Sequence, residues 1–483
     1  MKLLIIGIDG GDARIFSGFS MPAVEKIARS GSTIPLTQHP LERGWAAMLT
    51  GRRPSQTGAL YIRPDKQSPS LLSLRYSLAD MQANPDVVPL WQRINQLGGR
   101  VGIMNIPTTY PAPEVEGFFV SGAGGGLNRV EGIPDEMCFP RSIKSVLENH
   151  QYILDLRLGA TPYRDPHLLC RRIDEMMARR TAAFVELART EAVDFGFIGF
   201  RGTTVLQYLA MYEIESLLTT GKTATPYWQP LLASHYRLLD EQIAHLMDSL
   251  QPSHVILTSD HGCVPWQFNN NINGKLLELG LVGRHTAIRR SIKKILSTWG
   301  KGAFTTPLRD LAEGRMALHE SLAFGHWYLP GIYINDKRRF GGPIQEDQIE
   351  TLVTSICNQL SEDPTTRAAQ ITPKPYRRGF SGEAFFDELP DIWLDCPDSY
   401  FFHSEIGPLS EPNPNYGPLE TLEAVNTGMH SGQKGRHPIF LCDEGTASLR
   451  DSNSPTDLRL VYELASRLFE SATRNSPNLE RNP

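Results

Sequence analysis

Val255-Ile256-Leu257-Thr258-Ser259-Asp260-His261-Gly262 joins an apolar run to an adjacent carboxylate and imidazole. Such a short apolar run is typical of a buried strand in a mostly parallel sheet. In open α/β sheets, ligands bind beyond the carboxyl ends of the strands. The stretch therefore predicts an α/β fold in which Asp260 and His261 stand at the ligand-binding edge of the sheet.

The N-terminus has the same arrangement. Residues 1–12, MKLLIIGIDGGD, form an apolar run that breaks at glycines and presents Asp9 where the strand is expected to stop. Two aspartates and a histidine on two strand ends favour a divalent cation, because Asp oxygens with a His nitrogen suit zinc, manganese or iron. His430, in Asn426-Thr427-Gly428-Met429-His430-Ser431-Gly432, is the expected fourth member. The alternative interpretations are a turn or helix N-cap for Asp9 and an ordinary solvated histidine for His430.

These motifs together resemble the type I phosphodiesterase/nucleotide pyrophosphatase branch of the alkaline phosphatase superfamily. Three further stretches resemble the family in the same order along the chain: Trp45–Pro54, Gly99–Pro107 and Tyr376–Asp391. The resemblance implies an α/β fold of the alkaline phosphatase type, with a mostly parallel central sheet, helices on both faces and insertions that form a lid.

The chain also departs from the family at the position of the nucleophile. Family members place a Thr or Ser before the tryptophan-containing helix, and an ungapped register puts Leu41 there. Leucine has no atom that can attack phosphorus. Thr37, four residues upstream, is the remaining candidate nucleophile if the loop is longer than usual, and the alternative for Thr37 is a structural loop residue.

A second departure concerns the metal ligands. Where the family has an Asp and, four residues later, a His, this chain has Thr204 and Tyr208. By residue-for-residue comparison, Asp9, Asp260 and His261 hold one metal, and His430 alone remains of the other set. A hydroxyl or a phenol, whose ordinary pKa is about 10, is a poor metal ligand. We therefore expect one divalent ion, with zinc as the expected metal and manganese as the alternative, and we assign Thr204 and Tyr208 to substrate binding.

Glu42 and Arg43 stand beside the vacated nucleophile position. A guanidinium binds phosphate in a bidentate way, so Arg43 is a candidate catalytic residue and Glu42 a candidate substrate-binding residue. The alternative is an exposed ion pair of little energetic value.

The resemblance implies a metal-dependent phosphoester hydrolase or transferase acting on phosphodiesters or nucleotide pyrophosphates, with an altered active site. The rival hypothesis is a catalytically inactive relative that binds a phosphorylated ligand or a protein. The residues that separate these hypotheses are Leu41, Thr204 and Tyr208.

The amino-acid composition limits the kind of ligand and the compartment that we expect for this protein. The 483 residues are 40% hydrophobic and 21% charged, with a formal net charge of −5, so we expect a small phosphorylated substrate rather than nucleic acid. Six cysteines without paired metal spacing indicate reduced, packed thiols and predict a cytoplasmic protein. The oligomeric state is left open.

Changes in the strand and helix pattern along the chain predict its domain organisation. We expect a single domain over residues 1–474, with helical insertions at about 133–190 and 281–329, and a disordered tail over 475–483. No segment approaches the apolar length of a transmembrane helix. Residues 284–299 combine basic and apolar side chains at helical spacing, which indicates either peripheral membrane contact or packing on the protein.

Overall fold

A computed structural model describes most of the chain: residues 1–68, 70–73, 84, 86–123, 132–156, 165–283, 320–325, 328–403, 406–420 and 430–475. The basic stretch 284–299, most of the expected insertion 281–329 and the expected tail from 476 onward lie outside these residues. The chain divides into two compact units, and the single domain over 1–474 stays a prediction. The first unit comprises 1–59, 76–265 and 417–483, and the second comprises 60–75 and 266–416.

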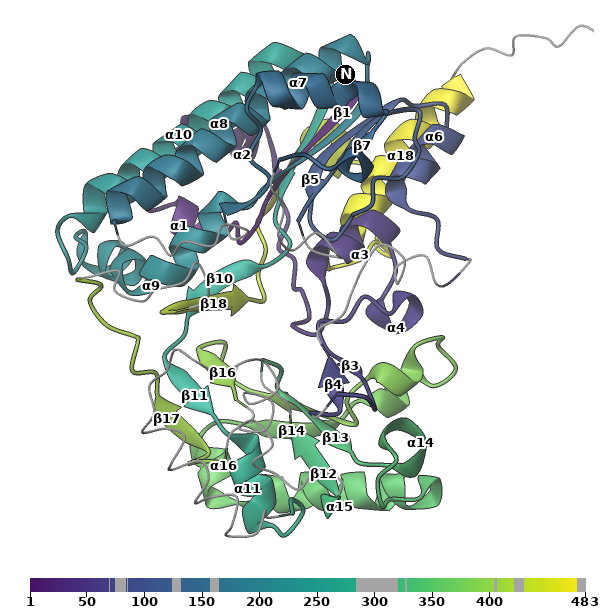
Figure 1. Cartoon of the computed structure of the whole chain (residues 1–483), viewed down its shortest axis with the longest axis vertical. Coiled ribbons are helices and arrows are strands. Elements are labelled where there is room, and N and C mark those ends of the chain that lie inside the picture. The colour runs from purple at the N-terminus through teal and green to yellow at the C-terminus, as the bar shows by residue number, and fades with distance from the viewer. Residues whose placement is uncertain are drawn as a thin grey trace, which may run out of the picture. The chain divides into compact units, whose positions relative to one another are not determined.

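The main sheet of the first unit has eight strands (Figure 1). In spatial order they are β2 (Gly31–Thr33), β19 (Phe440–Asp443), β9 (His254–Thr258), β1 (Leu3–Ile8), β8 (Phe195–Phe200), β5 (Val101–Ile106), β6 (Gly117–Ser121) and β7 (Cys138–Phe139). The run from β9 to β6 is parallel, and β2, β19 and β7 pair antiparallel at the two edges. The predicted mostly parallel α/β sheet is confirmed.

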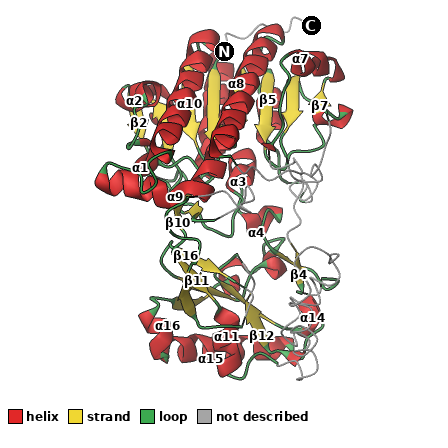
Figure 2. Cartoon of the chain, turned by 60° about the vertical axis from the view of Figure 1, so that its left-hand side comes forward, coloured by secondary structure: helices red, strands yellow, loops and turns green. Residues whose placement is uncertain are grey.

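Helices cover both faces of this sheet, as predicted. Because side chains alternate along a strand, Leu4 and Ile6 of β1 face one layer of helices and Leu3 and Ile5 face the other. The first layer contains α2 (Pro22–Arg29), α8 (Pro166–Thr190), α9 (Gly202–Thr220) and α10 (Trp228–Leu250). The second layer contains α3 (Gly44–Thr50), α6 (Leu90–Gln96) and α18 (Arg459–Asn475). Figure 2 shows α8 and α10 running side by side across the sheet.

The stretch expected as an insertion at about 133–190 contributes to the main sheet and its helical cover. Its β7 pairs with β6, and its long helix α8 packs against α10. Its other elements are η1 (Asp135–Met137), η2 (Arg141–Ile143) and α7 (Lys144–Asn149). Short elements complete the first unit: α1 (Ala13–Phe16), α4 (Pro54–Thr57), α17 (Glu444–Ala447) and the antiparallel pair β10 (Gly262–Pro265) and β18 (Gly432–Gly435).

Among its described residues, the second unit contains three small sheets. The largest is antiparallel, with the order β12 (Ala323–Gly325), β13 (Gly331–Ile334), β15 (Ile392–Asp395) and β14 (Thr372–Pro375). The others are β16 (Tyr400–Phe402), β11 (Phe268–Asn270) and β17 (Ser410–Pro412), and the pair β3 (Arg63–Pro64) and β4 (Leu72–Ser73). The helices are α11 (Ile272–Glu278), α14 (Lys337–Phe340), α15 (Ile349–Glu362) and α16 (Pro364–Ala368). In the described part of the chain, no helix is both long and apolar enough to cross a membrane.

Candidate active site

Three neighbouring strands, β9, β1 and β8, end at the same edge of the main sheet. Gly7 of β1 is in register with Thr258 of β9, and the amide of Asp9 donates to the carbonyl of Phe200 at the end of β8 (2.7 Å). Asp9 therefore follows the central strand, while Asp260 and His261 follow the strand beside it. Parallel pairing alone brings these sequence-distant residues to one place.

Asp9, Asp260 and His261 form a compact buried cluster. Their side chains are at most 8% exposed, and one ligand atom from each lies within 4.8 Å of the others. Nε2 of His261 is 3.5 Å from Oδ1 of Asp9 and 3.5 Å from Oδ2 of Asp260. In the described part of the chain, this is the one group of His, Cys, Asp and Glu side chains close enough to share an ion.

The orientation of the His261 ring favours a cation in this cluster. Its Nδ1 lies 2.6 Å from the carbonyl oxygen of Gly262. Because a carbonyl can only accept, Nδ1 carries the proton, and the Nε2 lone pair faces two carboxylate oxygens. That arrangement is repulsive unless Nε2 also takes a proton or a cation lies between the three groups. A histidine that donates through one nitrogen and binds metal through the other is the usual arrangement in metalloproteins.

The two carboxylates have opposite pKa shifts. Burial works to raise the pKa of Asp9, but the neighbouring His261, Arg201 and Lys434 outweigh it and lower the pKa to about 2. Burial and the charge of Asp9 raise the pKa of Asp260, against the opposing influence of His261 and Lys434. Such a split is expected for two buried carboxyl groups that interact strongly, and a bound cation would favour ionisation of both.

Arg201 and Asp155 are residues of the site that sequence reasoning missed. Arg201 follows β8 and is the N-cap of α9. Its Nε donates to Oδ2 of Asp9 (3.2 Å) and its Nη1 to Oδ2 of Asp155 (2.9 Å). Its position directly after an apolar strand is a signal that could have identified Arg201, because it matches the positions of Asp9 and Asp260. Asp155 lies outside regular structure and offers no comparable signal.

Thr204 and Tyr208, predicted in place of metal ligands, lie on α9 close to the cluster. The Oη of Tyr208 is 3.3 Å from Nε2 of His261, and the two rings are almost parallel. The fully buried Oγ1 of Thr204 lies against Gly10, and it forms no hydrogen bond among the described residues. His430 is half-buried, and its amide donates to the carbonyl of Tyr208 (3.2 Å). Burial lowers the pKa of the His430 imidazole.

The loop before α3 places the two candidate nucleophile positions differently. Leu41 is fully buried, and its amide donates to Nδ1 of His39 (3.2 Å). Thr37 is exposed, and its amide donates to the carbonyl of Thr456 (3.0 Å). The main chain of Thr37 is thus attached to the segment that precedes α18.

Glu42 and Arg43 lie in the loop before α3, next to Gly44, which contacts Asp260 of the Asp-Asp-His cluster. Arg43 is the half-buried N-cap of α3, and the next residue, Gly44, packs against the main chain of Asp260. Glu42 accepts a hydrogen bond from Nε2 of Gln38 (2.7 Å). Burial and the nearby carboxylate of Asp457 raise the pKa of Glu42 to about 7.

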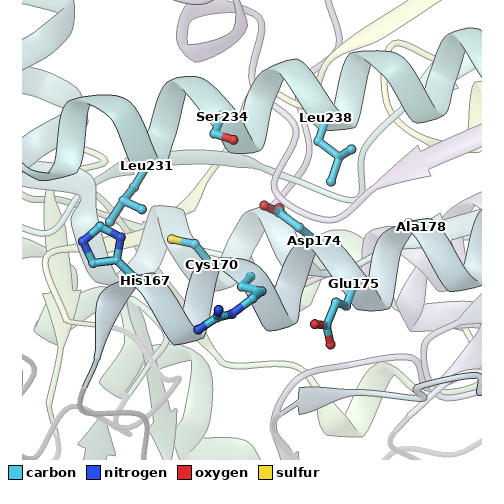
Figure 3. Close-up of a pocket in the computed structure, with 9 residues that line it drawn as sticks. His167, Cys170, Asp174, Glu175, Ala178, Leu231, Ser234 and Leu238 are labelled. Atoms are coloured by element: carbon cyan, nitrogen blue, oxygen red, sulfur yellow. The ribbon is translucent and has the colours of Figure 1, made fainter.

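A separate groove lies between α8 and α10 (Figure 3). Its volume is about 420 Å³, and Asp174 is among its lining residues. Asp174 lies 2.9 Å from Nδ1 of His235, whose Nε2 is 3.2 Å from Oγ1 of Thr203. This Thr-His-Asp arrangement is not a nucleophilic triad, because Thr203 is only 1% exposed and no substrate can reach it. Its role is to link α8, α9 and α10.

The α/β sheet with a buried Asp-Asp-His cluster at its carboxyl edge defines a fold that can bind a divalent ion. The chain belongs to the family described as type I phosphodiesterase / nucleotide pyrophosphatase, whose profile matches residues 3–432. This family is a group of phosphoester hydrolases that generally depend on divalent ions. A comparison with curated proteins gave no match.

Two solved structures align with this chain, and the first of them supports the fold. Phosphonoacetate hydrolase from Sinorhizobium meliloti 1021, in complex with phosphonoformate, aligns with a TM-score of 0.53 and 14% identity over 97% of this chain and 96% of that one. An inactive variant of murine ectonucleotide pyrophosphatase / phosphodiesterase 5, in complex with AMP, aligns with a TM-score of 0.46 and 12% identity over 97% and 95%. The expected alkaline-phosphatase-like fold is confirmed.

Proposed function

We propose that this protein cleaves phosphoric diesters or pyrophosphates with the help of one divalent metal ion. The observation that carries the proposal is the convergence of the His261 Nε2 lone pair and the carboxylates of Asp9 and Asp260 on one buried point. Two oxygens and one nitrogen suit zinc, with manganese as the alternative. Three protein ligands also leave a coordination position open, as in catalytic rather than structural metal sites.

A bound divalent ion supplies Lewis-acid charge to a phosphoryl oxygen and lowers the pKa of a nucleophile. The protein's own residues position the metal and the substrate. Asp9 and Asp260 are held rigidly at strand ends, and Tyr208 packs against the His261 ring. Arg43 is our candidate for binding the phosphoryl group, Glu42, Thr204 and Tyr208 are candidates for substrate contact, and His430 is the candidate group on the leaving side.

The nucleophile has two candidate sources, which are Thr37 and water. Attack by Thr37 would pass through a covalent phospho-enzyme, whereas attack by water would transfer the phosphoryl group in one step. The main-chain bond of Thr37 to Thr456, in the segment that precedes α18, supports water.

An inactive, ligand-binding relative is the second candidate function. The observation that favours it is the complete burial of Leu41 at the position where the family carries its nucleophile. Both candidate functions require the cation cluster, so metal binding alone does not separate them, whereas turnover does.

The deciding experiment compares bis(4-nitrophenyl) phosphate with 4-nitrophenyl phosphate, in zinc or manganese and after chelation. We expect slow, metal-dependent release of nitrophenol from the diester, less from the monoester, and none from Asp260→Asn. The control is Asp135→Asn, which removes an exposed aspartate paired with Lys144. If the wild type releases no product while still binding metal and phosphate, the inactive relative becomes the better description.

A further inference from the structure

The guanidinium of Arg201 is placed where a positive charge is needed. It lies between two buried carboxylates, since the side chains of Asp9 and Asp155 are 8% and 4% exposed. An uncompensated buried carboxylate is strongly destabilising, so some cation must accompany this pair. Arginine remains charged at every physiological pH and its planar fork suits two carboxylates at once. The site therefore contains one permanent positive charge in addition to any metal.

The two residues of α9 that replace the family's metal ligands add no charged ligand for a second metal. Thr204 and Tyr208, on the first two turns of α9 after Arg201, carry neutral side chains. The two bonds to Asp9 and Asp155 use Nε and Nη1. Nη2 forms no hydrogen bond among the residues that the structure describes, and the side chain keeps 16% exposure. One donor nitrogen thus remains available to a ligand in the site.

We propose that Arg201 is a built-in second cation of this site, which binds a non-bridging oxygen of a singly charged phosphodiester through Nη2 while Asp9 and Asp155 hold the guanidinium in place. The inference rests on the proposed function, which it deepens by assigning the substrate's charge. Arg201 is a catalytic residue in this proposal because it contacts the substrate, and Asp155 is a positioning residue.

The formal charges of the site select this substrate class. One divalent ion and the guanidinium of Arg201 supply less positive charge than two divalent ions would. A phosphodiester carries one negative charge, whereas a phosphomonoester dianion carries a second that would lack this counterion.

The test measures two affinities, for zinc and for dimethyl phosphate, in the full-length protein. The wild type is compared with Arg201→Met, Arg201→Lys and the control Arg189→Met. Arg189 is an exposed arginine on α8 that donates to the carbonyl of Ser249. Zinc affinity is measured by titration against a competing chelator. Binding of dimethyl phosphate, a singly charged diester, to the zinc-loaded protein is measured by ³¹P NMR. Circular dichroism checks the fold of each variant.

Arg201→Met should change the zinc affinity and the dimethyl phosphate affinity in opposite directions. Zinc should bind more tightly, because Asp9 loses a competing cation, while dimethyl phosphate should bind about 10- to 100-fold more weakly, the usual value of a charge-assisted hydrogen bond. Arg201→Lys should keep zinc affinity near the wild-type value and lose part of the diester affinity, and the control should change neither.

Two results would overturn the inference. Equal weakening of both bindings would show that Arg201 only supports the structure, and unchanged diester binding would show that it does not contact the ligand. If Arg201→Met fails to fold, unchanged diester binding in Arg201→Lys has the same meaning. The proposed function fails separately, through absence of turnover or through turnover that survives Asp260→Asn.

Discussion

Substituting Gly44 with alanine tests how closely the loop before α3 supports the metal cluster. A Cβ on Gly44 would lie 2.0 Å from the carbonyl oxygen of Asp260, and 2.7 Å from its carbonyl carbon and α-carbon. All three atoms belong to the main chain, so no side chain can turn aside to make room. The two segments must separate by roughly 1 Å or more to reach ordinary van der Waals contact.

The size of the effect follows from two opposing contributions. Alanine is the better helix former by up to about 1 kcal/mol, which favours the variant because Gly44 is the first residue of α3. Overpacking a close contact costs about 1–3 kcal/mol, or more when only main chain can move. We therefore expect a net loss of about 1–2 kcal/mol in the free energy of unfolding. Displacement of Asp260 should also weaken zinc binding about 10- to 100-fold, the usual effect of disturbing the surroundings of a metal ligand.

Urea denaturation gives the free energy of unfolding of Gly44→Ala, and chelator competition gives its zinc affinity. The matched control is Gly417→Ala, because a Cβ there meets nothing within 4 Å. The control should match the wild type in zinc affinity. Wild-type zinc affinity in Gly44→Ala, despite a measurable loss of stability, would refute the claim that this loop positions Asp260.

Three further predictions concern pH, the nucleophile and the metal. The pKa of Glu42 is raised from 4.5 to about 7 in the folded protein, so its folded state binds more protons between these values and stability falls as pH rises. Glu42→Gln should thus stabilise the protein by up to about 3 kcal/mol at pH 8 and hardly at all at pH 4, and equal urea midpoint shifts at both would contradict the assigned cause. Thr37→Ala should keep diester turnover within about twofold, since the main chain of Thr37 is bonded to Thr456 in the segment before α18, and a loss above about 100-fold would make Thr37 the nucleophile. Chelation should lower the melting temperature, because metal present at 100 times its dissociation constant adds about 2.7 kcal/mol, and an unchanged temperature would argue against tight binding.

The strand pattern allowed the positions of Asp9 and Asp260 in the fold to be predicted. The runs before Asp9 and Asp260 are short and apolar, and the structure places both residues at the ends of neighbouring parallel strands. Sequence reasoning could find them because a buried parallel strand needs apolar side chains on both faces, so the first polar residue marks its end. Helices on both faces follow from the same requirement.

Features that depend on distant contacts could not be predicted in this way. The proposed role of Arg201 depends on its ion pair with Asp155, which lies 46 positions earlier in irregular structure. The sequence around Asp155 gives no sign of this pairing. The second unit joins residues 60–75 to 266–416, a division that strand and helix periodicity does not encode. The main-chain hydrogen bond from Thr37 to Thr456 likewise links residues that are far apart in the sequence, so sequence pattern does not reveal it.

The metal content of the dialysed protein tests the central claim most directly. Asp9, Asp260 and His261 form the one described cluster suited to an ion, and Arg201 supplies the other positive charge. Elemental analysis after equilibration with zinc and dialysis should therefore find about one ion per chain in the wild type and almost none in Asp260→Asn. Two tightly held ions per chain, or one ion that survives Asp260→Asn, would contradict the account.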